Sequence, residues 1–530
     1  MAQVINTNIS SLNSQRNLTT SQASLSTSLQ RLSSGLRINS AKDDAAGLAI
    51  SERFTSQIRG NTTAARNAND GISLAQTAEG GLSTAGDLLQ RIRELAVQSA
   101  NGTNSDSDRK SIQGEVSALS QELDRVANTT QFNGQNVLDG SLTSAQFQVG
   151  ANSGQTINVG VQSAKASDIG NNTNASDYAG TVISQSIAGS TNNASAQTLS
   201  ITSGSGAVAT VDVKTGDTAK VIAAGVNAQS QSTGVTAQAK TSATLSNIAD
   251  GSIQFQLRGS NSIANDNESK PVTISAQVKA GDYSALAQAI NAQSATTNIS
   301  ATVKATADGK GKEILLTNGN GDDIKLQNTN TAVAGANTLG DGLATANIRG
   351  ADEPAVGSNK PTPATDLVIG AGGAADVYDP VTKTTTAGAG AQVTVGGHLD
   401  FSSDNGFSLS SDATTLISAS KASDLQSVSK LDVSTVEGSN AALKTIDSAL
   451  NAINSNRASL GAIQNRFAST ISNLNTTTEN LSASRSRIQD TDFASETANL
   501  TRGQILQQAG TAILAQANSL PNGVLSLLRG

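Results

Sequence analysis

Large apolar residues recur at seven-residue spacing near both ends of this 530-residue chain. Near the C-terminus one line runs without a gap through Ile446, Ile453, Leu460, Phe467, Leu474, Leu481 and Ile488. Near the N-terminus a similar rhythm is kept by Leu18, Leu25, Leu29, Leu32 and Leu36, and one register earlier by Ile5, Ile9 and Leu12. Such a repeat keeps one apolar line facing a partner helix only where helices supercoil. We therefore expect helical coiled-coil arms that pack on each other or on copies of the chain, as in an assembly subunit.

The two tails carry only short apolar lines. The C-terminal tail has Leu506, Ile513 and Leu520. We expect the helix to stop at residues 521–523, Pro-Asn-Gly, because proline interrupts helices. Helices shorter than about 12–15 residues are marginal in water, and these tails lack stabilising charge pairs. We therefore predict that both tails order only when they pair on assembly.

The middle of the chain, from about residue 145 to 430, has a different pattern. Short alternating runs such as residues 253–257 predict half-buried strands separated by hairpin turns. Residues 226–230, VNAQS, recur as residues 290–294, INAQS, which indicates two related modules of strand, short helix, strand and hairpin. The expected fold class is α+β multidomain: long helical coiled-coil arms from both termini packed together, with a β-rich central variable region.

Composition narrows the classes of function. Aromatic residues make up 2% of the chain, and there is no Trp and no Cys, so packing must rest on aliphatic side chains without disulfides. The formal charge of −7 offers no electrostatic footprint for nucleic acid. The N-terminus has no apolar core of a secretory signal, and no run approaches about 18 apolar residues. We expect neither nucleic-acid binding nor membrane insertion.

Candidate catalytic features are weak. The single histidine, His398, has no cysteine to join it, so a metal site or a catalytic triad is not expected. Residues 370–375 fit a dinucleotide-binding glycine pattern, but no apolar helix follows them. The loop that begins at Asn318 echoes calcium-loop spacing, yet it has Asp323 and Thr329 where such loops have Gly and Glu, so a polar hairpin tip is expected. We predict no catalytic, cofactor-binding or metal site and no enzyme.

Residues 90–95, QRIREL, place two arginines and one glutamate along a predicted helix. From the residues alone this is a solvated, salt-bridged face in which Arg91 pairs with Glu94 three positions later.

Both ends of the chain resemble bacterial flagellin, over about residues 1–160 and 430–530. The resemblance rests on residues 1–8 (MAQVINTN), 31–39 (RLSSGLRIN), 41–48 (AKDDAAGL), 131–134 (QFNG), 464–467 (QNRF), 490–494 (DTDFA) and 524–529 (VLSLLR). The repeated Val226-Asn227 and Ile290-Asn291 units resemble the "IN" modules inserted in flagellin and hook proteins.

This resemblance implies a structural subunit of the flagellar filament used for swimming. It also implies export by the flagellar type III apparatus, secretion to the extracellular flagellum, and no cofactor. The implied partners are further copies in a helical homopolymer, the secretion chaperone, the filament cap protein, the hook–filament junction proteins and the host Toll-like flagellin receptor.

The resemblance also assigns residues. Those matching the innate-receptor site are Gln90, Arg91, Arg93, Glu94, Leu95 and Glu115. Those expected in filament-core assembly are Ile5, Ile9, Leu12, Leu25, Leu29, Leu32, Leu506, Ile513 and Leu520. The shaft coiled-coil seam is the line from Ile446 to Ile488 given above. The end sensed by inflammasome receptors is Val524, Leu525, Leu527, Leu528 and Arg529.

The implied domains follow the change in pattern along the chain. They are residues 1–42, an N-terminal filament-core helix; 43–180, N-terminal shaft helices and a β-hairpin; 181–425, a variable outer β-rich region with two related modules; 426–490, a C-terminal shaft helix; and 491–530, a C-terminal filament-core helix.

Two alternatives stay open at this point. A coiled-coil surface adhesin shares the cysteine-free, Ser/Thr/Asn-rich composition, but it is expected to carry a cleavable signal and a C-terminal membrane anchor strand. A hook–filament junction protein shares the terminal heptads, but it is expected to lack the receptor-like group of residues 90–95.

Overall fold

The computed structural model describes residues 7–175, 184–262, 269–279, 281–306, 311–329, 343–350, 367–369, 377–379, 384–386, 391–417 and 420–528. The chain splits into two compact units. Unit 1 consists of Met1–Glu79, Leu142–Val161 and Ala458–Gly530, and unit 2 of Gly80–Ser141 and Gln162–Arg457. The glycine-rich residues 370–375 considered above lie outside the described residues.

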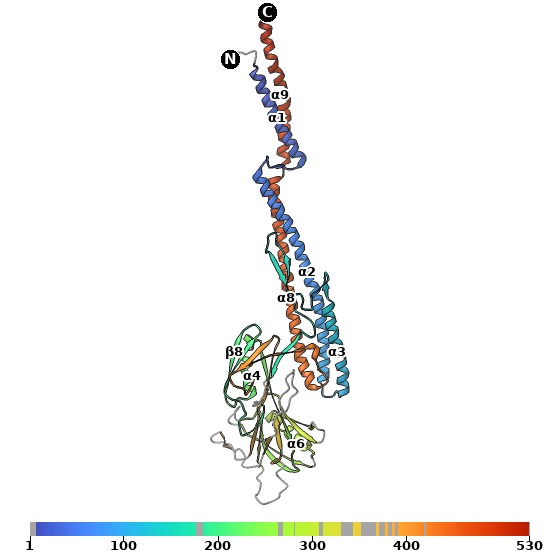
Figure 1. Ribbon diagram of the computed structural model, residues 1–530, viewed down its shortest axis with the longest axis vertical. Helices are drawn as coiled ribbons and strands as arrows, with labels where there is room; N and C mark the ends of the chain where they lie inside the picture. Colours follow the sequence, from blue (N-terminus) through green and yellow to red (C-terminus); the bar gives the residue numbers. More distant parts are fainter. Residues whose placement is uncertain are drawn as a thin grey trace. The chain divides into compact units, whose positions relative to one another are not determined.

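Long helices come from both ends of the chain, as the seven-residue pattern predicts (Figure 1). They are α1 (Ile9–Ser34), α2 (Ala45–Ala100), α3 (Asp106–Thr129), α8 (Val436–Gln489) and α9 (Phe493–Leu528). The α1 and α9 helices pack along each other within unit 1. The predicted fold class is therefore confirmed: helical arms from the two termini pack together and a β-rich region lies between them in the sequence.

Two expectations about the tails are wrong. The α1 helix has 26 residues and α9 has 36, so neither is as short as its apolar line suggests. In addition α9 does not stop at Pro521 but continues to Leu528. A proline within a helix removes one donor to the carbonyl four residues earlier, and that carbonyl, of Ala517, accepts a hydrogen bond from Asn8 at 2.8 Å instead.

The helix ends follow from local side-chain chemistry. Ser105 caps α3 and forms a capping box with Asp108, which supplies partners for the first free amides of the helix. The buried Arg109 donates hydrogen bonds to the carbonyls of Ser99 and Asn101, where α2 ends. The connection between these two helices is thus a fixed turn.

The links between the helices of unit 1 are bonded to each other. The α1 helix ends at Gly35, whose φ of 72° suits glycine. Its carbonyl accepts from the amide of Thr491 at 3.0 Å, and the amide of Arg37 donates to the carbonyl of Gln489 at 2.7 Å. The α1–α2 link and the α8–α9 link are therefore held together by backbone hydrogen bonds.

All described strand pairs are antiparallel. Unit 1 contains the hairpin of β3 (Ala145–Gln148) and β4 (Thr156–Val159). The other strands belong to unit 2: β1 (Gln131–Phe132), β2 (Gln135–Asn136), β5 (Gly170–Ala175), β6 (Ser186–Ala188), β7 (Gln197–Ser203), β8 (Val208–Val213), β9 (Thr236–Ser246), β10 (Gly251–Arg258), β11 (Val272–Val278), β12 (Ile299–Ala305), β13 (Lys312–Asn318), β14 (Ile324–Asn328), β15 (Asn347–Gly350), β16 (Leu367–Val368), β17 (Val377–Asp379), β18 (Thr384–Thr386), β19 (Gln392–Val395), β20 (His398–Ser403), β21 (Phe407–Ser411), β22 (Ser420–Ala422) and β23 (Asp424–Ser427).

Three larger sheets are present among the described residues, each with its own strand order. One sheet runs β11-β10-β14-β19-β6, another runs β12-β13-β9-β20-β5-β23 with β15 also on β9, and a third runs β22-β21-β7-β8. Short helices cover them: α4 (Ala219–Ala228), α5 (Ser230–Thr233), α6 (Ser284–Asn291) and α7 (Ser294–Thr297). A 3-10 turn, η1 (Val428–Lys430), leads into α8.

The two repeated segments have matching local structure. Each module has two strands, a helix pair and a third strand, one strand more than the sequence suggested. In the first module the side chain of Asn227 brackets Ala237, donating to its carbonyl at 2.9 Å and accepting from its amide at 2.8 Å. Asn291 brackets Ala301 in the same way, at 2.8 and 2.7 Å. The repeated asparagine therefore fixes helix to strand in both modules.

Each module has its own aliphatic core, and β9 contributes to both. One core contains Phe401 together with Ala237 of β9, and the other contains Phe255 together with Leu245 of β9. No helix among the described residues is long and apolar enough to cross a membrane.

Candidate interaction surfaces

The seam between α1 and α9 sets leucines of α1 against glycines of α9. A Cβ added at Gly503 would lie 3.3 Å from the Cδ1 of Leu25, and one added at Gly510 would lie 3.2 Å from the Cδ1 of Leu18. Ser28 of α1 is buried as well. Glycine at these positions lets the two helices approach closely.

Leu18 and Leu25 of the predicted N-terminal line lie in this seam, whereas the apolar lines nearest the two chain ends do not. Ile9 and Leu12 of α1, and Leu506 and Ile513 of α9, point into solvent, with Ile9 66% and Ile513 56% exposed. Leu29 is exposed too, whereas Leu25 and Leu32 are half-buried. Ile5 lies outside the described residues, and of Leu520 only the helical backbone is described.

Sequence reasoning missed two further members of this exposed set, Phe493 and Ile505. Seven of the eleven exposed large hydrophobic side chains among the described residues lie on α1 and α9: Ile9, Leu12, Leu29, Phe493, Ile505, Leu506 and Ile513. Exposed apolar side chains concentrated on one pair of elements mark an interaction site. We call these seven residues the outward apolar set.

The heptad line of α8 is buried over its first half. Ile446, Ile453, Leu460 and Phe467 are no more than 1% exposed, and Leu474, Leu481 and Ile488 are half-buried. Within unit 1 the ring of Phe467 packs edge-on against Phe147, with centroids 5.7 Å apart at 86°. Figure 1 shows α2 and α8 running along each other.

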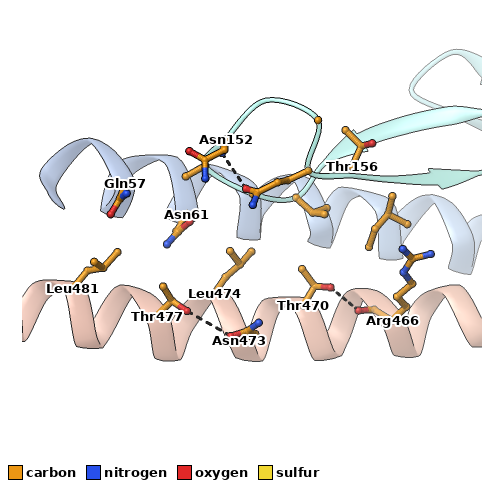
Figure 2. Close-up of a pocket in the computed structure, with 16 residues that line it drawn as sticks. Gln57, Asn61, Asn152, Thr156, Arg466, Thr470, Asn473, Leu474, Thr477 and Leu481 are labelled. Atoms are coloured by element: carbon orange, nitrogen blue, oxygen red, sulfur yellow. Dashed lines mark hydrogen bonds between the residues drawn. The ribbon is translucent and has the colours of Figure 1, made fainter. Parts of the chain in front are cut away.

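A groove of about 540 Å³ lies in unit 1 between α2, α8 and the β3–β4 hairpin (Figure 2). Figure 2 shows Gln57 and Asn61 pointing from α2 into the groove, toward Asn473 and Thr477 of α8. Arg466 is the one charged residue in its lining. Amides and hydroxyls with a single cation provide polar contacts but not the paired acid and base that general acid–base chemistry requires.

The receptor-like residues form an ion-paired surface in unit 2. Arg91 donates to Glu94 at 3.0 Å, as the sequence predicts, and to Glu115 of α3 at 2.9 Å. Its hydrogen bonds to these carboxylates, the one to Glu115 first, raise the pKa of the Arg91 guanidinium. Arg93 donates to Asp447 of α8 at 2.7 Å, and this hydrogen bond raises its pKa. The two arginines therefore tie α2 to α3 and to α8.

Exposure divides the predicted receptor residues. Gln90, Arg91, Arg93, Glu94 and Glu115 are exposed and lie together on this surface. Leu95 is 2% exposed, and Ile92 is buried, so residues 90–95 are not exposed throughout. Asp447, which no pattern pointed to, belongs to the surface because it is paired with Arg93.

The C-terminal residues expected to be sensed by inflammasome receptors lie at the edge of what the structure describes. Val524, Leu525, Leu527 and Leu528 belong to α9, but only their helical backbone is described, and Arg529 lies outside the described residues.

A buried acidic pair joins the two β modules, where a polar hairpin tip was expected. Asp322 and Asp323 are 0% and 1% exposed. Lys220 and Ser260 donate to Asp322 at 3.2 and 2.6 Å, and Asn192 donates to Asp323 at 3.1 Å. Burial raises the pKa of the Asp323 carboxyl to about 6. Hydrophobic patterning carries no signal for this site, because it arises where two modules meet.

Both ends of the chain match models of a known protein family. The bacterial flagellin N-terminal helical region matches residues 5–143, and the bacterial flagellin C-terminal helical region matches residues 443–528. The chain is 42% identical to a B-type flagellin of Pseudomonas aeruginosa over 534 residues and 39% identical to a flagellin of Salmonella muenchen over 554 residues, with 100% of each chain covered. It is also similar to the solved structure of FliC from Burkholderia pseudomallei, at 22% identity over 75% of this chain and 99% of that one, with a TM-score of 0.27.

Proposed function

Since the chain belongs to the bacterial flagellin family, the structural and non-enzymatic subunits that self-polymerise into the extracellular flagellar filament, we propose that its outward apolar set is the surface that other copies bury on assembly. The observation that carries this proposal is the concentration of exposed Ile, Leu and Phe side chains on α1 and α9.

The energetics favour this role. Each large aliphatic side chain that moves from water into an interface contributes roughly 1.5–3 kcal/mol. A head-to-tail contact repeated between copies generates an open helical array. Several such side chains per subunit therefore supply enough free energy to hold a polymer together.

Polymerisation of surface variants tests the proposal. Ile513→Asp places a charge in the proposed interface, and we expect the critical concentration for seeded polymerisation to rise by about 100-fold or more. Val208→Asp is the matched control, because Val208 is 64% exposed but lies on β8. If Ile513→Asp polymerises like the parent, or if both variants fail equally, the outward apolar set is not the assembly surface.

For the surface around Arg93 we propose recognition by the host Toll-like flagellin receptor. The exposed Gln90, Arg91, Arg93 and Glu94 support this, because arginines at the centre of an interface are common hot spots. Since Asp447 already holds Arg93 at 2.7 Å, we propose that the receptor contacts the pair and not the arginine alone.

Signalling by soluble monomer tests this recognition. Arg93→Ala should signal at least about 30-fold more weakly, which corresponds to roughly 2 kcal/mol. Arg125→Ala is the control, because Arg125 is an exposed arginine paired with Glu122 on α3, outside the surface. Equal signalling by the two variants, with unchanged circular dichroism, would reject the proposed site.

We also propose that the C-terminal tail, residues 491–530, interacts with the secretion chaperone before export and carries the inflammasome-sensed end, and that the filament cap and hook–filament junction proteins contact the same terminal helices. Support comes from family membership and from the apolar side chains that α9 leaves uncovered.

A further inference from the structure

One backbone carbonyl in α9 lacks its usual helical donor. An α-helix pairs each amide with the carbonyl four residues earlier, and residue 521 is a proline, which has no amide hydrogen. The carbonyl left over belongs to Ala517, a residue only 5% exposed. A buried carbonyl without a donor is costly, so continuation of the helix past Pro521 requires a replacement.

Asn8 supplies that replacement from the other end of the chain. Its Nδ2 donates to the Ala517 carbonyl at 2.8 Å. Its Oδ1 accepts from the amide of Ser11 at 3.0 Å and so caps the N-terminus of α1. Ser11 in turn donates through Oγ to Asn518 at 2.7 Å. One side-chain amide thus serves both helices: an ionised aspartate has no donor, and serine has a single polar atom where asparagine has separate donor and acceptor atoms.

We propose that Asn8 is a positioning residue for polymerisation: it couples the start of α1 to the last turns of α9, so that residues 521–528 become helical only when α1 is docked. Pro521 weakens α9 at this point, and the hydrogen bond from Asn8 restores it. The final segment of the subunit then takes its assembly-competent form only after the two termini have met. This inference rests on self-polymerisation, and it does not depend on which outward side chains make the intersubunit contacts.

A double-mutant cycle in the full-length chain tests the coupling. Asn8→Asp keeps the capping oxygen but removes the donor, and we expect it to raise the critical concentration for seeded polymerisation about tenfold. Pro521→Ala restores the amide, so Asn8→Asp in the Pro521→Ala background should cost less than about threefold. Non-additivity of this kind is the signature of two residues that share one interaction.

Hydrogen exchange in the assembled filaments provides a second readout. In Asn8→Asp filaments the amides that follow Pro521 should exchange faster, while amides near residue 500 keep their protection. The proposal is overturned if Asn8→Asp polymerises like the parent, or if it costs the same in both backgrounds. Ile513→Asp should impair assembly with either residue at position 521, whereas Asn8→Asp should be rescued by Pro521→Ala. The test of the outward apolar set and the test of the Asn8 coupling can therefore fail independently.

Discussion

Gly71 of α2 lies directly against the ring of Phe467 of α8: a Cβ built on Gly71 would come within 2.5 Å of the ring Cζ. Phe467 is fully buried, and its ring also packs edge-on against Phe147 of the β3–β4 hairpin. A glycine inside a helix costs roughly 0.5–1 kcal/mol relative to alanine. Here that cost is offset because only a glycine leaves room for the ring between the two helices.

Gly71→Ala should therefore destabilise unit 1 although it raises helix propensity. The ring cannot move aside without disturbing Phe147, and overpacking of this kind costs roughly 1–3 kcal/mol. Thermal unfolding followed by circular dichroism measures the effect. Gly80→Ala, in the same helix but with nothing within 4 Å of the added Cβ, should instead stabilise the protein by up to about 1 kcal/mol. Equal stability changes in the two variants would show that the Gly71–Phe467 contact does not limit packing.

The buried Asp323 predicts a pH dependence for the β modules. Its pKa in the folded protein is about 6, above the ordinary value of 3.8, so the folded state keeps a proton that the unfolded chain releases at lower pH. The stabilisation from that proton is complete below about pH 4 and is lost as pH rises through about 6. Lys325 and Asp322 lie next to this carboxyl, and Lys220 pairs with Asp322. The substitution tested below leaves these three residues unchanged.

Asp323→Asn should remove this dependence. Relative to the parent, the variant should become more stable as pH rises from 4 to 7, by on the order of 2 kcal/mol, since one pKa unit corresponds to about 1.36 kcal/mol. Calorimetric unfolding of the full chain at several pH values measures the difference. Asp250→Asn, at an exposed turn, is the control for removing one carboxylate from the chain. A stability difference between Asp323→Asn and the parent that does not change between pH 4 and 7 would contradict the assigned protonation.

The outer modules should be dispensable for polymerisation. The strands β5 and β23 pair with each other, with Thr173 opposite Asp424, so the two cut ends of a deletion between them lie side by side. Joining residues 175 and 424 through a short Asn-Gly turn should leave a subunit that still forms filaments, of smaller diameter, by electron microscopy. A deleted chain that keeps its helical circular dichroism but does not polymerise would assign part of the assembly surface to the modules.

The long helices were readable from the chain because their apolar lines keep one period over many turns. The line from Ile446 to Phe467 is buried, and the repeated Asn227 and Asn291 make the same hydrogen bonds in the two repeated segments. These signals are local or strictly periodic. Each signal can therefore be recognised without knowing what the element packs against.

What could not be predicted depends on partners. The apolar line of Leu506 and Ile513 indicated packing on the other arm or on another copy; the seam uses Gly503 and Gly510 of α9, and the apolar line faces outward. An apolar stripe shows that a face will be covered and does not say whether the same chain or another copy covers it. Asp323 escaped notice for a similar reason, because its burial comes from the meeting of two modules.

The most direct test of assembly through the terminal helices is hydrogen exchange of monomer and filament, compared amide by amide. On the α9 side the seam has glycines, Gly503 and Gly510, which bury little apolar surface, so the pair should open often in the free monomer and close when other copies cover the outward apolar set. We predict that exchange in α1 and α9 slows by at least about 100-fold on polymerisation, while the β-module cores around Phe255 and Phe401 change little. Terminal helices that are already as protected in the monomer as in the filament would contradict the account.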